Sequence, residues 1–251
     1  MAKLFSMFTN YGKPGAGVSK GSVPEQPKFW QWFARNFNKL IGVNLIFILS
    51  CLPVVTIGLA VTGMTRVVRN IARDDAAFVW GDYIDSIKQN WKISIPVTLI
   101  NLVVGGLLCT SIYVYSVNSE QSGFAGSVGL PITIVLLCFF LIVNFYVHYM
   151  MVTFDIDLKH LYKNAVILTI TSFWKNVLTL LMVAALWFAV YILWYWNLIG
   201  ICVGLGVLML FSFTSFIICY QLTPVIRKNL IDPLEAEKEP EEEESIFQDR
   251  V

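Results

Sequence analysis

The sequence predicts an all-α, polytopic helical membrane protein, and three observations support this fold class. Hydrophobic residues make up 57% of the 251 residues and charged residues only 14%, whereas about a quarter of a typical soluble domain is charged. The mean hydropathy is high, at +0.67. The strongest apolar runs each have about the length that a helix needs to cross a bilayer, roughly 17 to 25 residues. None of these runs contains Lys, Arg, Asp or Glu: 40–63, 93–117, 130–151, 177–194 and 198–220.

The two ends of the chain differ from the apolar region between them. Residues 1–28 contain Gly, Pro and Lys and predict a flexible N-terminal arm without the apolar segment of a cleavable signal peptide. Residues 29–224 form the predicted helical transmembrane domain. Residues 225–251 contain the acidic run EAEKEPEEEE, which is typical of a solvated, disordered tail.

The run NLIFILSCLPVVTIG, residues 44–58, decides the predicted topology because Pro53 lies in its middle. A helix usually ends before Pro, which lacks an N–H and clashes with the preceding turn. Thr56 is of a residue type that can cap the next helix. A hairpin that turns at Pro53, Thr56 and Gly58 predicts six membrane helices arranged as three hairpins, the first of them short. A straight span here predicts five helices and termini on opposite sides.

The positions of the basic residues favour the hairpin. Lys and Arg precede residues 44–58, follow them directly, and recur within 159–175 and at 227–228, whereas the connections 118–129 and 195–197 contain none. Cytoplasmic segments of membrane proteins are enriched in Lys and Arg, and the hairpin places every basic segment on one side. We therefore expect a multi-pass plasma-membrane protein with both termini in the cytoplasm. Five straight spans remain the alternative, because Pro also kinks continuous membrane helices.

Two segments of the chain resemble a known family. The first is NLIFILSCLPVVTIG followed by Arg69, Arg73 and WGDYIDSIKQNW (80–91), and the second is FDIDLKHLYKNA (154–165). Both are similar to segments of the YesL-like bacterial membrane proteins, a domain-of-unknown-function family. The resemblance covers about residues 36–224 and implies an integral membrane protein of Gram-positive-type bacteria. Genes of that family often lie near carbohydrate-uptake systems, so the resemblance implies an accessory role there. It implies no catalytic or ligand residues.

Polar side chains within the predicted spans are few. Ionisable groups inside a membrane usually mark ion or substrate paths, and His148 is the candidate of this kind. The simpler interpretation is that Asn44, Asn101 and Asn144 make hydrogen bonds between helices. The alternative is an uncharged substrate path formed by Asn44, Asn101, Asn144 and His148. All five Cys lie in apolar runs without a CxxC or Cys/His cluster, so we expect no metal, disulfide or cofactor.

The segment 66–92 is the predicted cytoplasmic loop with the most charge. Its carboxylates lack the spacing and Gly turns of a cation-binding loop. Aromatic residues interleave with the charges over 78–91, which predicts a short amphipathic helix on the inner leaflet. Acidic neighbours make nucleic acid an unexpected partner. The sequence instead predicts a surface for a protein partner, formed by Arg69, Arg73, Asp82, Asp85 and Lys88.

Two hypotheses for function follow from these patterns. The leading one is a non-enzymatic accessory or regulatory membrane protein that acts through its cytoplasmic loops, with a carbohydrate transporter component as partner. The alternative is a small permease or channel with an uncharged substrate path. An intramembrane enzyme is the weakest interpretation, because the spans contain no Ser/Lys dyad, Asp pair or HExxH motif. Asp155 and Asp157 are expected to cap a helix rather than to bind a metal.

Overall fold

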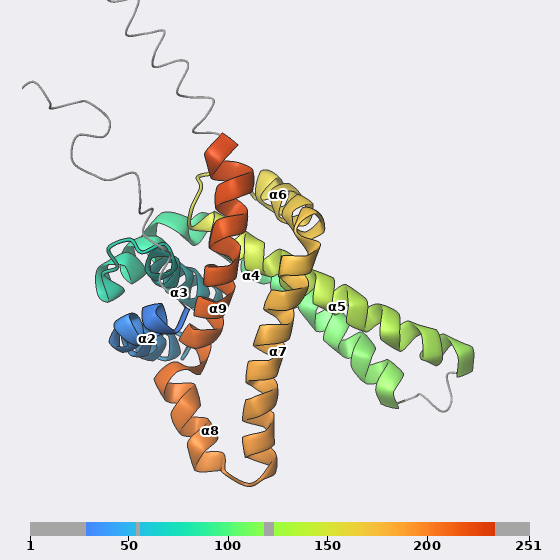
Figure 1. Cartoon of the computed structure of the whole chain (residues 1–251). Helices are drawn as coiled ribbons and strands as arrows, with labels where there is room; N and C mark the ends of the chain where they lie inside the picture. The colour runs from blue at the N-terminus through green and yellow to red at the C-terminus, as the bar shows by residue number, and fades with distance from the viewer. Residues whose placement is uncertain (1–28, 54–55, 118–122, 234–251) are drawn as a thin grey trace, which may run out of the picture. The chain divides into compact units, whose positions relative to one another are not determined.

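The computed structural model describes residues 29–53, 56–117 and 123–233, and every regular element in these ranges is a helix. The chain divides into two compact units, Met1–Phe37 and Asn38–Val251. In the first unit the Asn36 amide donates to the Trp32 carbonyl over 3.1 Å. The helices (Figure 1) are α2 Phe29–Ser50, α3 Ile57–Ala72, α4 Val79–Val117, α5 Gly123–Met151, α6 Leu158–Thr171, α7 Phe173–Tyr195, α8 Ile199–Leu205 and α9 Phe211–Ile226, with π-helical turns η2 Gly206–Leu210 and η3 Arg227–Ile231.

Four helical stretches of the described chain are long and apolar enough to cross a membrane: Val79–Val117, Val128–Met151, Phe173–Tyr195 and Ile199–Ile231. At most 28% of the most apolar window of each is buried within the protein, so most of these apolar side chains face outward, as a lipid environment requires. The predicted class, a helical membrane protein, is thus confirmed.

The count of six membrane helices stays a prediction, because α2 and α3 are not among these four stretches. The 16 residues of α3 extend about 24 Å at 1.5 Å per residue, against roughly 30 Å of hydrocarbon. Helix α2 carries Arg35 and Lys39 in its first half. Neither six helices nor five straight spans is established.

The helix break predicted at Pro53 is confirmed. Helix α2 ends at Ser50 and α3 begins at Ile57, while residues 54–55 lie outside the described ranges. Thr56 occupies the N-cap position of α3, but its side chain does not cap that helix. Its hydroxyl has one proton to donate and lies within hydrogen-bond distance of two carbonyls, that of Ser50 and, at 2.7 Å, that of Pro53. Thr56 therefore closes the end of α2, which corrects the predicted capping role.

Gly58 is not a turn residue, because it lies within α3 and faces α4. A Cβ at Gly58 would lie 1.6 Å from the Thr98 hydroxyl oxygen, and one at Gly63 would lie 2.9 Å from the Tyr83 ring. Small residues allow this close approach of two helices in membrane proteins. The pair α3 and α4 thus packs along a glycine-containing face.

Hydroxyl groups reinforce the same interface. The Thr62 and Ser94 hydroxyl oxygens lie 2.9 Å apart, and the Ser86 hydroxyl donates to the Thr62 carbonyl over 3.2 Å. Residues 79–91 are helical, as predicted, but they do not form a short helix: they are the first part of α4, which continues through Pro96 to Val117. Packing against α3 extends this helix beyond the apolar run that begins at residue 93.

The last helix also extends past its predicted end. It passes through Pro224 and continues in η3 to Ile231, so the first residues of the predicted acidic tail are helical. The rest of that tail, 234–251, and the predicted arm, 1–28, lie outside the described residues.

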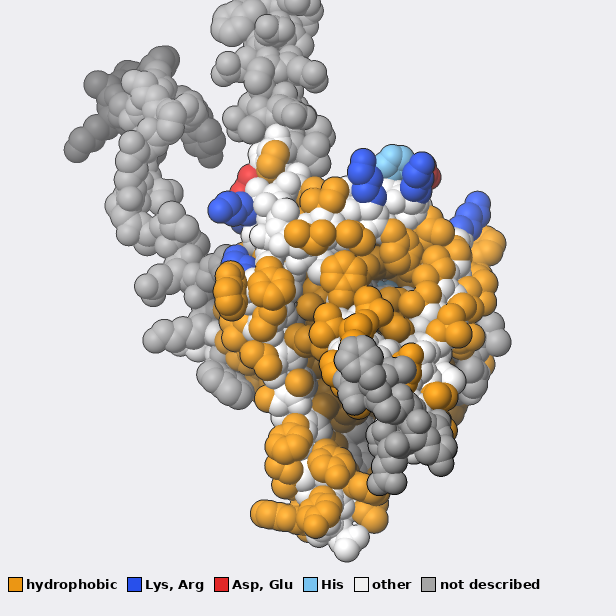
Figure 2. Space-filling view, turned by 90° about the vertical axis from the view of Figure 1, so that its right-hand side faces the viewer, with side chains coloured by type: hydrophobic (Ala, Val, Ile, Leu, Met, Phe, Trp, Pro, Cys, Tyr) orange, Lys and Arg blue, Asp and Glu red, His pale blue; other side chains and the backbone are white. Residues whose placement is uncertain are grey.

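Exposed basic side chains gather where α4, α6 and α7 begin and where α9 ends. Figure 2 shows Lys and Arg at the upper end of one face and hydrophobic side chains over the lower part. We call this region the basic end; it is defined by the exposed residues Lys88, Lys92, Lys159, Lys163, Lys175, Arg227 and Lys228.

Candidate functional site

Asn44, one of the predicted path residues, is fully buried and holds α2 against the last helix. Its amide donates to the carbonyls of Gly206 and Val207 over 3.0 and 2.7 Å. Its side-chain oxygen accepts the backbone N–H of Ser212 over 2.9 Å. These three backbone groups belong to the π-helical turn η2 and to the start of α9, where the regular i→i−4 pairing is disturbed. Asn44 therefore acts as an interhelical clamp, and its polar atoms are engaged.

The other three predicted path residues lie on α4 and α5. The amide nitrogen of Asn101 lies 3.5 Å from Nε2 of His148. Asn144 precedes His148 by one helical turn and donates to the Phe140 carbonyl over 2.9 Å. Three buried atoms, the side-chain oxygens of Asn101 and Asn144 and Nδ1 of His148, have no hydrogen-bond partner among the described residues. The structure thus brings Asn101, Asn144 and His148 together and places Asn44 elsewhere.

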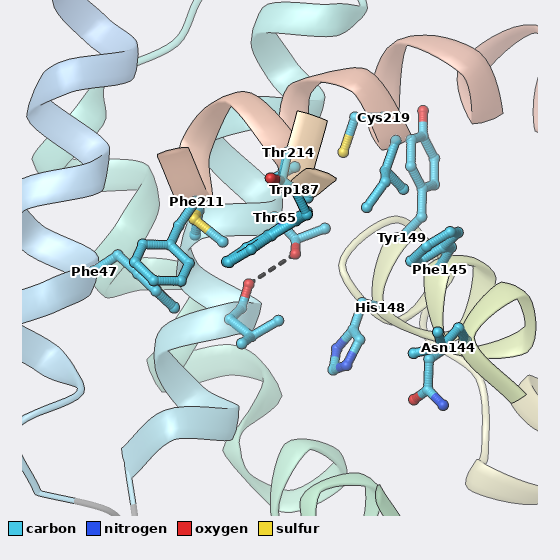
Figure 3. A pocket seen from close by; sticks show the side chains of 15 residues that line it. Phe47, Thr65, Asn144, Phe145, His148, Tyr149, Trp187, Phe211, Thr214 and Cys219 are labelled. Atoms are coloured by element: carbon cyan, nitrogen blue, oxygen red, sulfur yellow. Dashed lines mark hydrogen bonds between the residues drawn. The ribbon is translucent and has the colours of Figure 1, made fainter. Parts of the chain in front are cut away.

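A cavity of about 270 Å³ adjoins Asn144 and His148. Figure 3 shows these two side chains on one side of it and the rings of Phe47 and Phe211 on the other. The wall comes from α2, α3, α5, α7 and α9, and it is mainly apolar. Its residues are Phe47, Val61, Met64, Thr65, Leu141, Asn144, Phe145, His148, Tyr149, Trp187, Phe211, Thr214, Ser215, Ile218 and Cys219. Because five helices contribute, no local sequence pattern predicts this cavity.

The sequence predicts that Arg69 belongs to an exposed partner surface, but Arg69 is buried. Its side chain is only 9% exposed and donates to the carbonyl of Val152 and, over 3.0 Å, to the hydroxyl of Thr153. A second guanidinium nitrogen donates to the side-chain oxygen of Asn70 over 2.7 Å. A cation at a helix C-terminus is favourable, so Arg69 caps the end of α5 from α3 and is not available at the surface.

Asp82 also has a structural role. Its carboxylate accepts the backbone N–H of Phe78 and the amide of Asn70, each over 3.0 Å. It therefore satisfies a free N–H at the start of α4 and ties that end to α3. An acidic residue in the first turn of a helix could have indicated this role from the sequence.

The other residues of the predicted surface remain accessible. Arg73 is exposed and pairs with Asp75 at 3.3 Å, and Asp85 and Lys88 are exposed on α4. Exposed ion pairs contribute little to stability. These three positions are thus free to contact a partner without cost to the fold.

Two adjoining polar hollows of about 420 Å³ each lie at the basic end and share Asp155. We call them together the basic-end recess. One is lined by Ile93, Asp155, Ile156, Asp157 and His160, and the other by Arg66, Gln89, Asn90, Met151, Val152, Thr153, Phe154 and Asp155.

One acidic residue of the recess differs from its predicted role as a helix cap. Asp157 is at the N-cap position of α6, but its side chain does not make the expected cap hydrogen bond. Within the described ranges, no three His, Cys, Asp or Glu side chains lie close enough together to hold a metal ion. The recess offers hydrogen-bonding groups of both kinds, including the Arg66 guanidinium, which donates to Gln89 over 3.0 Å.

Comparison with known proteins supports the resemblance for one region of the chain. Residues 40–112 match the family described as "Protein of unknown function, DUF624". The matched region contains Asn44, the break at Pro53, all of α3 and most of α4. It covers less than a third of the chain, and it agrees with the similarity to the YesL-like proteins. No curated protein and no solved structure matches the chain.

Proposed function

We propose that this protein is a non-enzymatic accessory or regulatory membrane protein that binds a partner protein at its basic end. The observation that supports this proposal is the basic-end recess, where polar groups of α3, α4 and the α5–α6 connection line a surface hollow. The exposed charges of Asp85 and Lys88 lie on the same end of α4. A partner can therefore be recognised by both hydrogen bonds and charge complementarity.

In the proposed topology, six helices form three hairpins, and both termini face the cytoplasm of a plasma membrane. The support is the gathering of exposed Lys and Arg at one end, since cytoplasmic segments are basic. Single Cys tags at Lys13 and Glu243, both outside the described residues, test it in a Cys-free chain. We expect a membrane-impermeant thiol reagent added to intact cells to label neither tag. Labelling at Lys13 alone would contradict the first hairpin.

The proposed partner class, a carbohydrate transporter component, is supported only by the resemblance to the YesL-like proteins. A photo-crosslinking amino acid at exposed Gln89, and separately at exposed Lys159, tests both the surface and the class. The same partner should be captured from native membranes at both positions. Asn197, in the turn between α7 and α8, is the matched control and should capture nothing.

Two outcomes of this crosslinking distinguish the proposals. Recovery of the protein alone at Gln89 and Lys159, under mild detergent, contradicts an accessory function. A shared partner without any part in carbohydrate uptake keeps the accessory function and removes the transporter as partner class. Charge reversal by Lys88→Glu should weaken capture if the partner contacts the exposed face of α4.

A small permease with an uncharged path is the second candidate, favoured by the cluster of Asn101, Asn144 and His148 beside the cavity. The cavity wall is mainly apolar, so most hydroxyl groups of a sugar would lie there unpaired, which is costly. Reconstituted liposomes with a broad panel of labelled sugars test this function. Absence of uptake for every sugar would reject the sugar-permease alternative.

A further inference from the structure

We propose that the corner between α6 and α7 binds anionic phospholipids of the adjoining leaflet. Figure 1 shows α6 leading into the upper end of α7. The lipid-binding surface, which we call the interfacial patch, consists of six exposed residues: Lys163, Ile167, Ile170, Phe173, Trp174 and Lys175. None of the six lines the basic-end recess, so the patch is separate from the surface proposed for a partner protein.

The length of α7 places the patch at the level of the lipid headgroups. The 23 residues of α7, Phe173–Tyr195, extend about 35 Å at 1.5 Å per residue, slightly more than the roughly 30 Å of hydrocarbon. Aromatic side chains occur at both ends of the helix, Trp174 at its start and Trp194 near its end. Such residues are enriched at the two membrane–water interfaces. The corner therefore lies where acyl chains meet headgroups.

Helix α6 carries half of the patch along one stripe of its surface. Lys163, Ile167 and Ile170 follow one another at i, i+4 and i+7, which is the spacing of one helix face, and all three are exposed. The opposite side of α6 packs inward through Leu161 and Ala165, which are fully buried. The exposed stripe changes from basic to apolar toward the corner. This order suits a helix in the interface, with its charge among the headgroups and its apolar residues at the acyl boundary.

The apolar side chains of the patch are too exposed for a surface in water. The exposed fraction is 64% for Ile170, 57% for Phe173 and 82% for Trp174. The two aromatic rings pack edge to face, with centroids 5.6 Å apart. Adjoining apolar side chains that are this exposed mark a site of interaction with a membrane or a protein. Their place beside the start of a span favours lipid.

The charges of the patch select an anionic lipid. The chain contains no Asp or Glu between Leu158 and Ile231, so neither α6 nor α7 supplies a counter-ion for Lys163 or Lys175. Neither lysine forms an ion pair with another residue of the described ranges. Each Lys near an anionic lipid surface strengthens binding about five-fold. A zwitterionic lipid has no net charge and gains much less.

A buried network of hydrogen bonds fixes the shape of the corner. Asn176 of α7 is buried, and its amide donates to the carbonyls of Thr169 and Leu168, at the end of α6, over 2.9 and 3.4 Å. Its side-chain oxygen accepts the Tyr146 hydroxyl of α5 over 2.7 Å. One side chain thus holds the end of α6 against the first turn of α7. The patch is therefore organised before a lipid binds, which favours affinity.

The test is photolabelling of the full chain in phosphatidylcholine nanodiscs that contain a trace of phosphatidylglycerol with a diazirine on one acyl chain. We expect saturable labelling of peptides from α6 and the first turns of α7. Added unlabelled phosphatidylglycerol should displace the probe. A phosphatidylcholine probe with the same diazirine chain should label these peptides about five-fold less.

Charge variants separate the patch from the net charge of the basic end. The double variant Lys163→Gln, Lys175→Gln should lower labelling of the corner about ten-fold, while the apolar side chains that the diazirine reaches stay in place. The double variant Arg227→Gln, Lys228→Gln is the matched control, because it removes two exposed charges from the end of α9. It should leave labelling of the corner unchanged.

Several outcomes overturn the proposal. Equal labelling by the two probes contradicts selection of an anionic headgroup, and equal losses in the two double variants contradict a site at this corner. Displacement by glycerol 3-phosphate, which has the charge but no acyl chains, means that the patch binds a soluble phosphate instead of a lipid. Unchanged labelling in Trp174→Ser removes the apolar half of the patch from the site. Size-exclusion elution and the unfolding midpoint establish that each variant is folded before it is labelled.

Discussion

Replacing Asn44 with Leu should destabilise the protein strongly, although Leu has the same number and branching of non-hydrogen side-chain atoms. Asn44 is fully buried and makes three hydrogen bonds to backbone groups of Gly206, Val207 and Ser212. Leu fills the space and makes none of them. The three backbone groups then lie buried without the partner that α2 supplies.

The magnitude follows from what a lost buried hydrogen bond costs. An unsatisfied buried group costs about 1–3 kcal/mol, whereas side-chain hydrogen bonds inside membrane proteins average about 0.6 kcal/mol. For three bonds these values give a loss of stability between about 2 and 9 kcal/mol. The turn η2 can relax around the new side chain, so we expect a value in the lower part of this range. We expect a decrease of about 3 kcal/mol in the free energy of unfolding.

Unfolding by SDS in mixed micelles, followed by tryptophan fluorescence, measures this change. Asn44→Asp keeps the acceptor for Ser212 but turns a second oxygen toward the two carbonyls, so it should be at least as destabilising. Asn90→Leu is the matched control, because it removes one bond within α4, to the Ser86 carbonyl, and should cost less than about 1 kcal/mol. The clamp role of Asn44 would be refuted if the free energy of unfolding of Asn44→Leu lay within about 0.5 kcal/mol of that of the unmodified chain, which is the effect of an ordinary surface substitution.

Two further predictions use the same unfolding assay. Gly58→Ala should cost about 2–3 kcal/mol, because its Cβ would lie 1.6 Å from the Thr98 hydroxyl, and Thr98→Ala should relieve part of this cost. Gly106→Ala, where an added Cβ meets nothing within 4 Å, should be neutral or slightly stabilising; equal losses at both glycines would contradict the helix contact. Arg69→Met should cost about 2–3 kcal/mol because charged hydrogen bonds to the end of α5 are lost. Arg73→Met, at an exposed position, should change the free energy of unfolding by less than about 0.5 kcal/mol. An equally small effect of Arg69→Met would refute the capping role of Arg69.

Several features of this protein could be predicted from the sequence because their causes are local. A run of apolar residues is stable in lipid whatever its neighbours are, so the membrane class follows from the runs themselves. The helix break also follows from one residue, since Pro53 cannot continue the backbone pairing of α2. The sequence predicts one polar set of Asn44, Asn101, Asn144 and His148; the structure brings the last three together, and nothing local indicates that Asn44 lies elsewhere.

Other features depend on contacts between distant residues. Asn44 meets its partners 162 to 168 positions later, at a π-helical turn that has no clear sequence signal. Arg69 looks like a surface charge by composition, yet the end of α5 lies beside it and buries it. The first part of α4 looks like an interfacial helix, but Gly63 and Thr62 of α3 pack against Tyr83 and Ser86 and hold it in line with the span.

The sequence by itself determined the membrane class, the gathering of basic charge in a few segments and the break at Pro53, because solvation by lipid and backbone geometry act on neighbouring residues. Only the tertiary structure decided which polar groups are engaged and which are left without partners. Asn44, Arg69 and Asp82 became structural residues, whereas Asn144 and His148 kept unpartnered atoms beside a cavity. That division depends on which helices pack together, and packing joins residues that no local pattern connects.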